Sequence, residues 1–268
     1  MSAFPSRVRL GRSQLEVGPL GVAGGYGVDA ASLREAFERG VNYFYHGSLR
    51  RSGMQQAVRE IVKNGQRDRL VLALQSYSRW PGVLEHFFVK GLKSLNLEYA
   101  DVLLLGLFNG PPSPRLLDRV EKLREKGLFR QLAISAHRRP QFLEFAKDPR
   151  YSILHVRYSA AHPGAEHDVF PHLPSENRPG VVAYTATAWG RLLTSSRMPE
   201  GSAPLRGRDC YRFVLTNQDF NVCMTGPRDV AQMREALAAL DEGPCSAEEI
   251  ERFRRIGQHV HGLSKSSQ

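Results

Sequence analysis

Short runs of apolar residues alternate along this chain with segments whose apolar residues recur at helical spacing. Continuous apolar runs are typical of strands buried on both faces, as in a parallel sheet covered by helices. After Pro19 the runs predict strands at 20–24, 42–47, 70–75, 100–106, 131–136, 153–159, 180–187 and 220–226.

The segments between these runs predict helices, and Gly40, Gly65 and Gly127 each follow the last periodic residue of one, as helix ends often do. The expected helices are Ala30–Arg39, Gly53–Lys63, Val83–Leu95, Pro114–Lys126, Pro140–Lys147, Arg208–Thr216 and Arg228–Leu240. Segment 162–180 has little helical period and predicts a short helix with a loop. A βα rhythm of this length favours a (β/α)8 TIM barrel, in the α/β class, over an open doubly wound sheet.

Both ends of the chain add elements to this barrel. VRLGRSQLEV at 8–17 alternates apolar and polar residues and predicts a β-hairpin. Ser246 and Glu249 have the spacing of a capping box at the start of an amphipathic helix. We expect this helix to pack against the barrel, with a partner-binding helix as the alternative. Residues 1–268 are then one domain, with a disordered tail at 261–268.

Length and composition narrow the class of protein. A chain of 268 residues with 41% hydrophobic residues is long enough to bury one large core. The absence of a run of 18 apolar residues and of a signal-like N-terminus predicts a cytoplasmic protein with no membrane segment. Cys210, Cys223 and Cys245 lack C-x-x-C spacing and are expected to be buried free thiols.

The chain is basic, with a formal net charge of +10. Its basic residues are spread along the sequence and are not interleaved with aromatic residues as in a base-stacking surface. An anionic small-molecule ligand is therefore favoured, and nucleic acid is the lesser alternative.

Common catalytic and metal motifs are missing: the sequence contains no G-x-S-x-G, no H-E-x-x-H and no P-loop. The spacing of His155, His162, His167 and His172 matches no standard metal-ligand set, which favours loop histidines over a metal site.

The stretch from Gly25 to Ala30 satisfies the dinucleotide pattern G-x-G-x-x-A. That pattern needs an acidic residue at the end of the next strand to hold a ribose, but Tyr45, His46 and Gly47 stand there. We interpret the glycines as a turn at the barrel mouth.

Five stretches, in the right order, resemble sequence patterns of the aldo-keto reductases. They are NYFYHGSLRRSG at 42–53, SLNLEYADVLLLG at 94–106, EKLREKGLFRQLAIS at 121–135, VVAYTATAWGRLL at 181–193 and VCMTGPRDVAQMREAL at 222–237. The resemblance spans nearly the whole chain. It implies a (β/α)8 barrel and the reduction of carbonyls by hydride transfer from NADPH.

The resemblance fails at the residues that carry the chemistry. The positions of the family's catalytic aspartate, tyrosine, lysine and histidine hold Tyr45, Arg50, Gln75 and Gly106. Hydride transfer leaves an alkoxide, so a proton donor and positive charge must still meet the oxygen. In a rebuilt site Tyr45 donates the proton, and positive charge comes from His46, Arg50, Arg51 and Arg79.

Further polar residues fall at or just beyond predicted strand ends, the face where barrel enzymes place their chemistry. The expected catalytic residues are Tyr45, His46, Arg50 and Gln75, and the expected substrate contacts are Arg51, Tyr77, Arg79 and His137. Ordinary polar loop residues are the alternative interpretation.

The cofactor half of the pattern is better kept. The resemblance gives Ser135 a contact with the nicotinamide amide, Tyr184 stacking on the ring, and Thr185 the hydroxyl of a family serine. The loop and helix after the eighth strand match at Gly226, Arg228, Gln232 and Glu235, where arginine and a helix N-terminus suit a 2′-phosphate. His155 replaces a family glutamine, and Ala136 and Ala236 replace asparagines. NADP(H) is the expected cofactor, with binding weakened or lost.

These residues predict an NADP(H)-dependent oxidoreductase with a rebuilt proton-donor site, acting on a small, anionic carbonyl or alcohol substrate. The alternative is a non-catalytic barrel that binds a nucleotide or an anionic metabolite in a regulatory role, with an anion-binding mouth at Arg50, Arg51, Arg79 and Arg138. The substrate, the choice between NADP and NAD, and the oligomeric state are left open.

Overall fold

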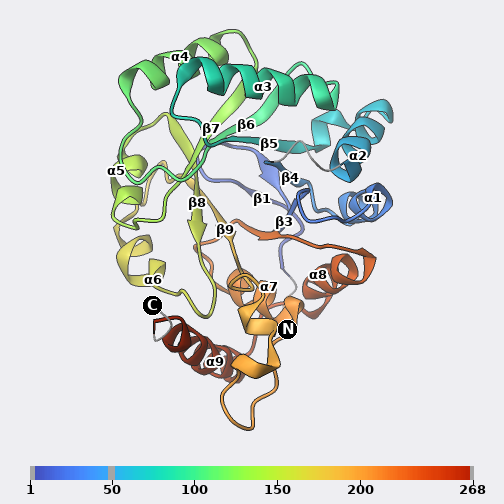
Figure 1. The fold of residues 1–268 in the computed structure, drawn as a ribbon, viewed down its shortest axis with the longest axis vertical. Coiled ribbons are helices and arrows are strands. Elements are labelled where there is room, and N and C mark those ends of the chain that lie inside the picture. The colour runs from blue at the N-terminus through green and yellow to red at the C-terminus, as the bar shows by residue number, and fades with distance from the viewer. Residues whose placement is uncertain (1–3, 48–51, 266–268) are drawn as a thin grey trace.

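The computed structural model describes residues 4–47 and 52–265. In this part of the chain eight parallel strands close into a barrel in the order β10-β3-β4-β5-β6-β7-β8-β9, with helices around the outside (Figure 1). The strands are β3 (Leu20–Ala23), β4 (Tyr43–His46), β5 (Val71–Ser76), β6 (Ala100–Leu105), β7 (Phe129–Ser135), β8 (Tyr151–Arg157), β9 (Gly180–Tyr184) and β10 (Val222–Thr225). The predicted barrel is confirmed.

The helices follow the strands along the chain. They are α1 (Ala30–Glu38), α2 (Ser52–Lys63), α3 (Pro81–Leu95), α4 (Pro114–Glu125), α5 (Gln141–Lys147), α6 (Ala165–Asp168), α7 (Gly207–Thr216) and α8 (Val230–Glu242). Short 3₁₀ turns are η1 (Arg67–Arg69), η2 (Phe170–His172), η3 (Arg191–Leu193) and η4 (Ser195–Arg197). The segment after β8 is a short helix with a loop, as its pattern predicts.

An antiparallel hairpin of β1 (Val8–Arg9) and β2 (Glu16–Val17) lies at the end of the barrel where the strands begin. Arg12 in its turn donates hydrogen bonds to the carbonyl oxygens of Ala146, Asp148 and Tyr151, at 3.1, 2.8 and 2.6 Å. The hairpin is therefore tied to the turn that leads from α5 into β8.

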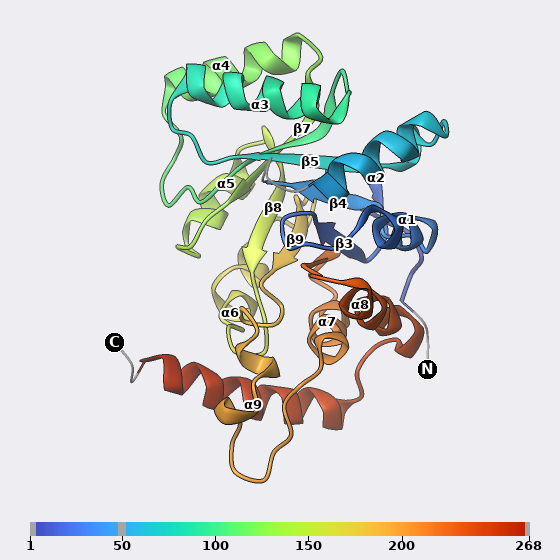
Figure 2. The same ribbon diagram turned by 45° about the vertical axis from the view of Figure 1, so that its right-hand side comes forward.

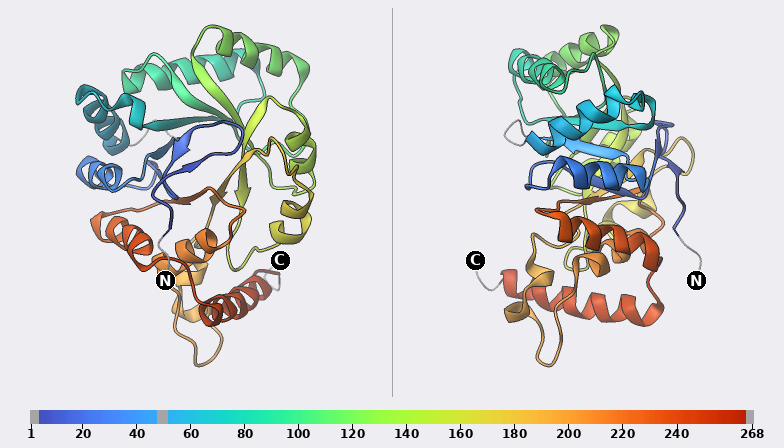
Figure 3. Two further views of the ribbon diagram at one scale, coloured as in Figure 1. Left: turned by 180° about the vertical axis from the view of Figure 1, so that it is seen from behind. Right: turned by 90° about the vertical axis from the view of Figure 1, so that its right-hand side faces the viewer.

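The C-terminal helix α9 (Ala247–Lys265) runs beside α7 and the loops that follow β9 (Figures 2 and 3). It begins with the predicted capping box, because Ser246 Oγ accepts from the Glu249 N–H and Glu249 Oε2 accepts from the Ser246 N–H. Buried Arg212 of α7 donates to both carboxylate oxygens of Glu249, at 2.7 and 2.8 Å. The helix continues through residue 265, past the point where the tail is expected to become disordered.

Side chains of each strand alternate between two apolar layers. One layer fills the barrel, with residues such as Tyr43, Ala73 and Ile153, and the other lies between strands and helices, with residues such as Phe44 and Leu72. Because successive side chains of a strand point to opposite faces, the polar residues at the strand ends also face either the barrel interior or the helices. Odd-numbered positions on β4 and β5, and on β8 from Ile153 onward, face the barrel interior, and even-numbered positions face the helices.

The three cysteines are free thiols, with Cys210 and Cys223 buried and Cys245 partly buried, as expected. Among the helices within 4–47 and 52–265, none is both long enough and apolar enough to span a bilayer.

We predict that Arg12→Ala lowers the free energy of unfolding by about 1–3 kcal/mol, because several part-buried carbonyl groups lose their donor. Arg9→Ala is the matched control in the same hairpin, since the exposed Arg9 side chain bonds only to Gln14. It should cost less than about 0.5 kcal/mol. Urea unfolding followed by circular dichroism measures both, and equal losses would contradict the role given to Arg12.

Candidate active site at the barrel mouth

The mouth of the barrel is lined by side chains at the carboxyl ends of the strands. Arg157 and Tyr184 are the last residues of β8 and β9, Tyr45 and Gln75 are the last but one of β4 and β5, and Tyr45 and Tyr184 pack against the interior layer. Of these four described side chains, Arg157 is charged and the other three are uncharged.

Tyr45 is mostly buried in this mouth. Burial raises the pKa of its phenol well above the usual value, and neighbouring Tyr77 raises it further. A Cβ atom at Gly47 would stand 2.2 Å from the Tyr45 hydroxyl oxygen, so the phenol lies against that glycine. Tyr45 is thus protonated at physiological pH and can donate a hydrogen bond.

Gln75 and Tyr77 fill the space beside Gly106. A Cβ at Gly106 would lie 2.1 Å from Gln75 Nε2 and 2.7 Å from the Tyr77 ring. By the resemblance, Gly106 stands where the aldo-keto reductases carry their histidine. That volume is taken here by an amide and a phenol, so the two replacements at 75 and 106 fit one another.

His46 does not share the mouth with Tyr45. It occupies an even-numbered position of β4, and its ring lies on the outer side of the strand, beside α3. Burial lowers the pKa of His46 to about 4, so the imidazole is neutral at pH 7. The structure therefore does not bring it to the place where positive charge is expected.

The Arg79 side chain is held by hydrogen bonds to backbone carbonyl groups. Its guanidinium donates to the carbonyl oxygens of Tyr77, Gly106 and Leu107, at 2.6, 3.1 and 2.6 Å, and lies over the Phe108 ring. These contacts hold the loop after β6 against the end of β5. A substrate at Arg79 would compete with them.

The other expected substrate contacts are placed differently. His137 is exposed, and its backbone N–H donates to Asn109 Oδ1, as does that of exposed Arg138. Burial and Arg157 lower the pKa of the His137 imidazole. Arg50 and Arg51 lie outside the described residues.

On the cofactor side, Ser135 and His155 are buried and already hydrogen-bonded. Ser135 Oγ accepts from the Leu107 N–H at 2.9 Å, and His155 Nε2 pairs with the Tyr43 hydroxyl at 2.8 Å inside the barrel. Burial lowers the pKa of His155 to about 3. His155 is therefore neutral.

Tyr184 is the last residue of β9, and Thr185 follows it at the mouth. The Tyr184 hydroxyl donates to the Ala136 carbonyl at 3.4 Å, and its pKa is raised to about 12, mainly by burial, with Arg157 acting in the opposite direction. Thr185 has a positive φ of 62° and donates its hydroxyl to the Tyr184 carbonyl.

The turn between β10 and α8 presents a cation. Arg228 is exposed, its N–H donates to Gln232 Oε1, and its guanidinium has no hydrogen-bond or ion-pair partner within 4–47 and 52–265. The turn lies just before the N-terminus of α8, so the donor set suits a phosphate group. Glu235 instead accepts the Gly207 N–H at 3.0 Å and holds α7 to α8.

Gly226 of the same turn is covered by an aromatic ring. A Cβ at this glycine would lie 2.8 Å from the Tyr26 ring, and one at Gly27 would lie 3.1 Å from the Arg228 carbonyl. The glycines of the β3–α1 connection thus form a turn at the mouth, as predicted, and this turn lies against the cation-bearing turn.

Arg157 was not among the expected site residues. It lies two positions beyond His155 on the interior face of β8, 5.8 Å from the centre of the Trp189 ring. It lowers the pKa of Tyr184 and of His162, which places it within electrostatic reach of both. The period-two alternation of β8 is the signal that would have revealed it.

No cluster of His, Cys, Asp or Glu in the described part of the chain has the geometry of a metal site. His162 instead packs its ring against Trp189 and His261, at 5.8 and 5.4 Å between ring centres. Burial is the main cause that lowers the pKa of His162, to about 4.

No known family profile and no curated protein sequence matches the chain. Among solved structures, aldo-keto reductase AKR11C1 from Bacillus halodurans in its holo form superposes with a TM-score of 0.75 at 21% identity, over 93% of this chain and 95% of its own. An aldo-keto reductase from Klebsiella pneumoniae in complex with NADPH gives 0.73 at 20% identity, over 96% of both chains. The chain has the aldo-keto reductase fold. The likeness that the sequence stretches indicate is thus confirmed at the level of fold.

We predict that stability falls as pH is lowered below about 6.5, because His155 binds a proton in the unfolded chain but not in the folded one. Its contribution is about 1.4 kcal/mol per pH unit until the pH approaches the folded pKa. His46 and His162 act in the same direction.

Urea unfolding of His155→Gln between pH 7 and 4.5 measures this contribution. In His155→Gln the free energy of unfolding should depend less steeply on pH, by about 1.4 kcal/mol per pH unit. His86→Gln, an exposed control on α3, should keep the pH dependence of the unmodified protein. An unchanged slope in His155→Gln would mean that the buried imidazole is protonated in the folded protein.

Proposed function

We propose that this protein is an NADP(H)-dependent oxidoreductase with a rebuilt proton-donor site, acting on a small anionic carbonyl compound or alcohol. The observation that carries the proposal is the Tyr45 phenol, which lies in the barrel mouth and remains protonated because burial and Tyr77 raise its pKa. The fold supports it, since the neighbours with this barrel are aldo-keto reductases, one of them in complex with NADPH.

The proposed cofactor contacts are Arg228 and Tyr184. The guanidinium of Arg228, which has no partner in the described part of the chain, lies just before α8 and suits the 2′-phosphate that distinguishes NADP from NAD. The Tyr184 ring at the end of β9 offers a flat surface for the nicotinamide. When bound, the cofactor supplies a hydride to the carbonyl carbon of the substrate.

Tyr45 completes the reaction by donating its phenolic proton to the carbonyl oxygen, which has gained negative charge. An alkoxide is a stronger base than a phenolate, so the transfer is downhill even from a phenol with a raised pKa. Tyr77 lies beside Tyr45 and is 55% exposed, and it can pass a proton from solvent back to Tyr45.

Arg157 provides the positive charge and selects an anionic substrate. Its guanidinium has no carboxylate within ion-pair distance in the described part of the chain, and the Trp189 ring beside it limits access of water from one side. A carboxylate on the substrate can pair with the planar guanidinium through two hydrogen bonds. Small keto acids are therefore the substrates to test first.

Arg228→Ala should weaken NADPH binding by about ten- to a hundredfold, because the phosphate loses a charge-assisted partner, and should leave NADH binding unchanged. Arg234→Ala is the matched control on the same helix, where the side chain is exposed and pairs with Glu35. Quenching of intrinsic fluorescence measures both affinities. No binding of either nucleotide at millimolar concentration would end the proposal.

Tyr45→Phe should lower kcat by about 10²- to 10⁴-fold, the usual contribution of a positioned proton donor, without weakening NADPH binding. Tyr99→Phe, at the opposite end of the barrel just before β6, should turn over normally. The assay follows NADPH oxidation with a panel of keto acids and matched neutral carbonyls. Normal turnover by Tyr45→Phe would rule out this residue as the acid.

The second function is a barrel that binds a nucleotide or anionic metabolite without turnover, in a regulatory role. It is favoured by the same raised pKa, because no cation within the described residues lowers the pKa of Tyr45, and by the filled space beside Gly106. Tight NADPH binding with no turnover on the whole panel would establish it over the first.

A further inference from the structure

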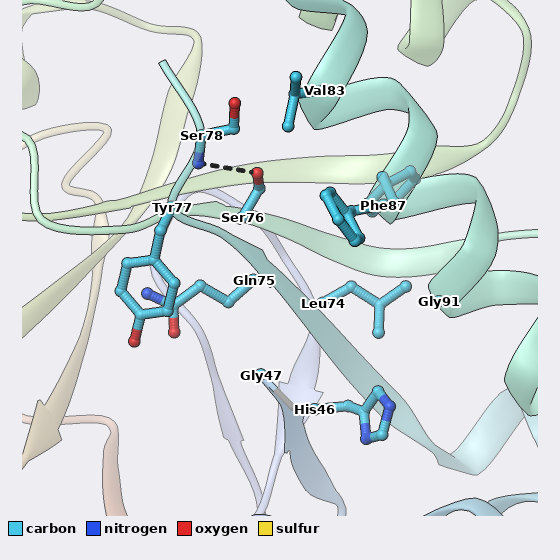
Figure 4. A pocket seen from close by; sticks show the side chains of 11 residues that line it. His46, Gly47, Leu74, Gln75, Ser76, Tyr77, Ser78, Val83, Phe87 and Gly91 are labelled. Carbon is cyan, nitrogen blue, oxygen red and sulfur yellow. Dashed lines mark hydrogen bonds between the residues drawn. The ribbon is translucent and has the colours of Figure 1, made fainter. Parts of the chain in front are cut away.

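A cavity of about 550 Å³ lies outside the barrel, between the ends of β4 and β5 and helix α3. Figure 4 shows His46, Leu74 and Phe87 on one side of β5, while Gln75 and Tyr77, which border the cavity, extend to the other side. The cavity therefore touches the outer side of the strand end whose inner side belongs to the mouth.

One stripe of α3 forms the apolar wall. Val83, Phe87 and Gly91 follow one another at a spacing of four residues, so they lie on the same side of the helix. Val83 is 44% exposed and Phe87 is 52% exposed, although both are apolar. Their exposed surface borders the cavity and has no cover in the described part of the chain.

Gly91 leaves the floor of the cavity open. A Cβ here would stand 3.5 Å from Leu74, which is an ordinary contact distance. Alanine would therefore fit, and it is also favoured over glycine in the middle of a helix. Packing does not require the glycine, and its effect is to leave space.

The polar end of the cavity is His46. Its side chain is 4% exposed, and its Nε2 atom is buried without a hydrogen-bond partner among residues 4–47 and 52–265. Buried polar atoms in folded proteins nearly always have a partner, because leaving one unpaired is costly. A ligand hydroxyl in the cavity would supply the missing partner.

The described lining of the cavity carries no charge. Its described lining consists of apolar, serine, glutamine and tyrosine residues besides His46, whose imidazole is uncharged because burial lowers its pKa to about 4. Among the described lining residues, an anionic ligand would find no cation. A hydroxyl group both donates and accepts, so it can pair with Nε2 in either tautomer of the neutral ring.

We propose that this cavity is a second small-molecule site, which binds a neutral aromatic alcohol with its hydroxyl on His46 Nε2 and its rings against Leu74 and Phe87. The volume falls within the range of about 300–1,000 Å³ typical of such sites. The site is independent of the proposed nucleotide site, because β5 lies between them.

Equilibrium dialysis with 1-naphthol tests the proposal, with naphthalene as the probe that lacks the hydroxyl and 1-naphthoate as the charged probe. We expect one naphthol per chain, with a dissociation constant of about 10–100 μM for a ligand of this size. Naphthalene and naphthoate should each bind at least about tenfold more weakly, since they leave His46 unpaired or bury an unpaired charge.

Two variants locate the probe. His46→Leu should remove the preference for naphthol over naphthalene, and Phe87→Ala should weaken both by about tenfold through loss of the aromatic wall. His259→Leu is the control, because His259 is exposed on α9 and does not line the cavity. Circular dichroism verifies that each variant is folded.

A competition experiment separates this site from the mouth. Saturating NADPH should leave naphthol binding unchanged, whether or not the protein proves to be an oxidoreductase. Displacement of naphthol by NADPH, equal binding of naphthol and naphthalene, or unchanged preference in His46→Leu would each overturn the proposal, as would the absence of saturable naphthol binding up to 1 mM.

Discussion

Closure of the parallel strands into a barrel forces neighbouring residues of each strand to opposite sides of one wall. At the end of β4 this places Tyr45 in the mouth and His46 against α3, although the two are adjacent in the chain. At the end of β5 the same rule separates Gln75 from Ser76. The mouth and the outer cavity are thus two sides of one short stretch of sheet. Whether a residue has an odd or an even number decides which of the two its side chain lines.

Burial has opposite effects on the two kinds of titratable group at these strand ends. It disfavours the charged form in both cases, so the pKa of Tyr45 rises and the pKa values of His46 and His155 fall. All three side chains are consequently neutral at pH 7. Among the described strand-end residues of the mouth, Arg157 carries positive charge, while Arg79 beyond β5 is held by backbone carbonyl groups. Arg157 therefore contributes directly to the electrostatic character of the site.

The strands and helices could be read from the sequence because strands buried on both faces and helices with one apolar side leave strong periodic signals. Strand-end residues could be named in the same way, and Tyr45, Gln75 and Tyr184 do lie at the mouth. The hydrogen bonds that individual side chains make could not be predicted from the sequence. Arg79 and Glu235 both bond to backbone groups that are brought close only by the tertiary structure. Arg157 could not be named in this way because it matches no position of the family pattern, whose position on β8 is His155.

The packing beside Gly106 bears on how such a site can change over evolutionary time. The Gln75 amide and the Tyr77 ring occupy the volume that a side chain at 106 would need. A histidine introduced there alone would have to displace both. Positions 75, 77 and 106 are thus coupled through one shared volume, so a change at any one of them alters the space open to the other two. New side chains at this edge of the mouth are accommodated more easily together than one at a time.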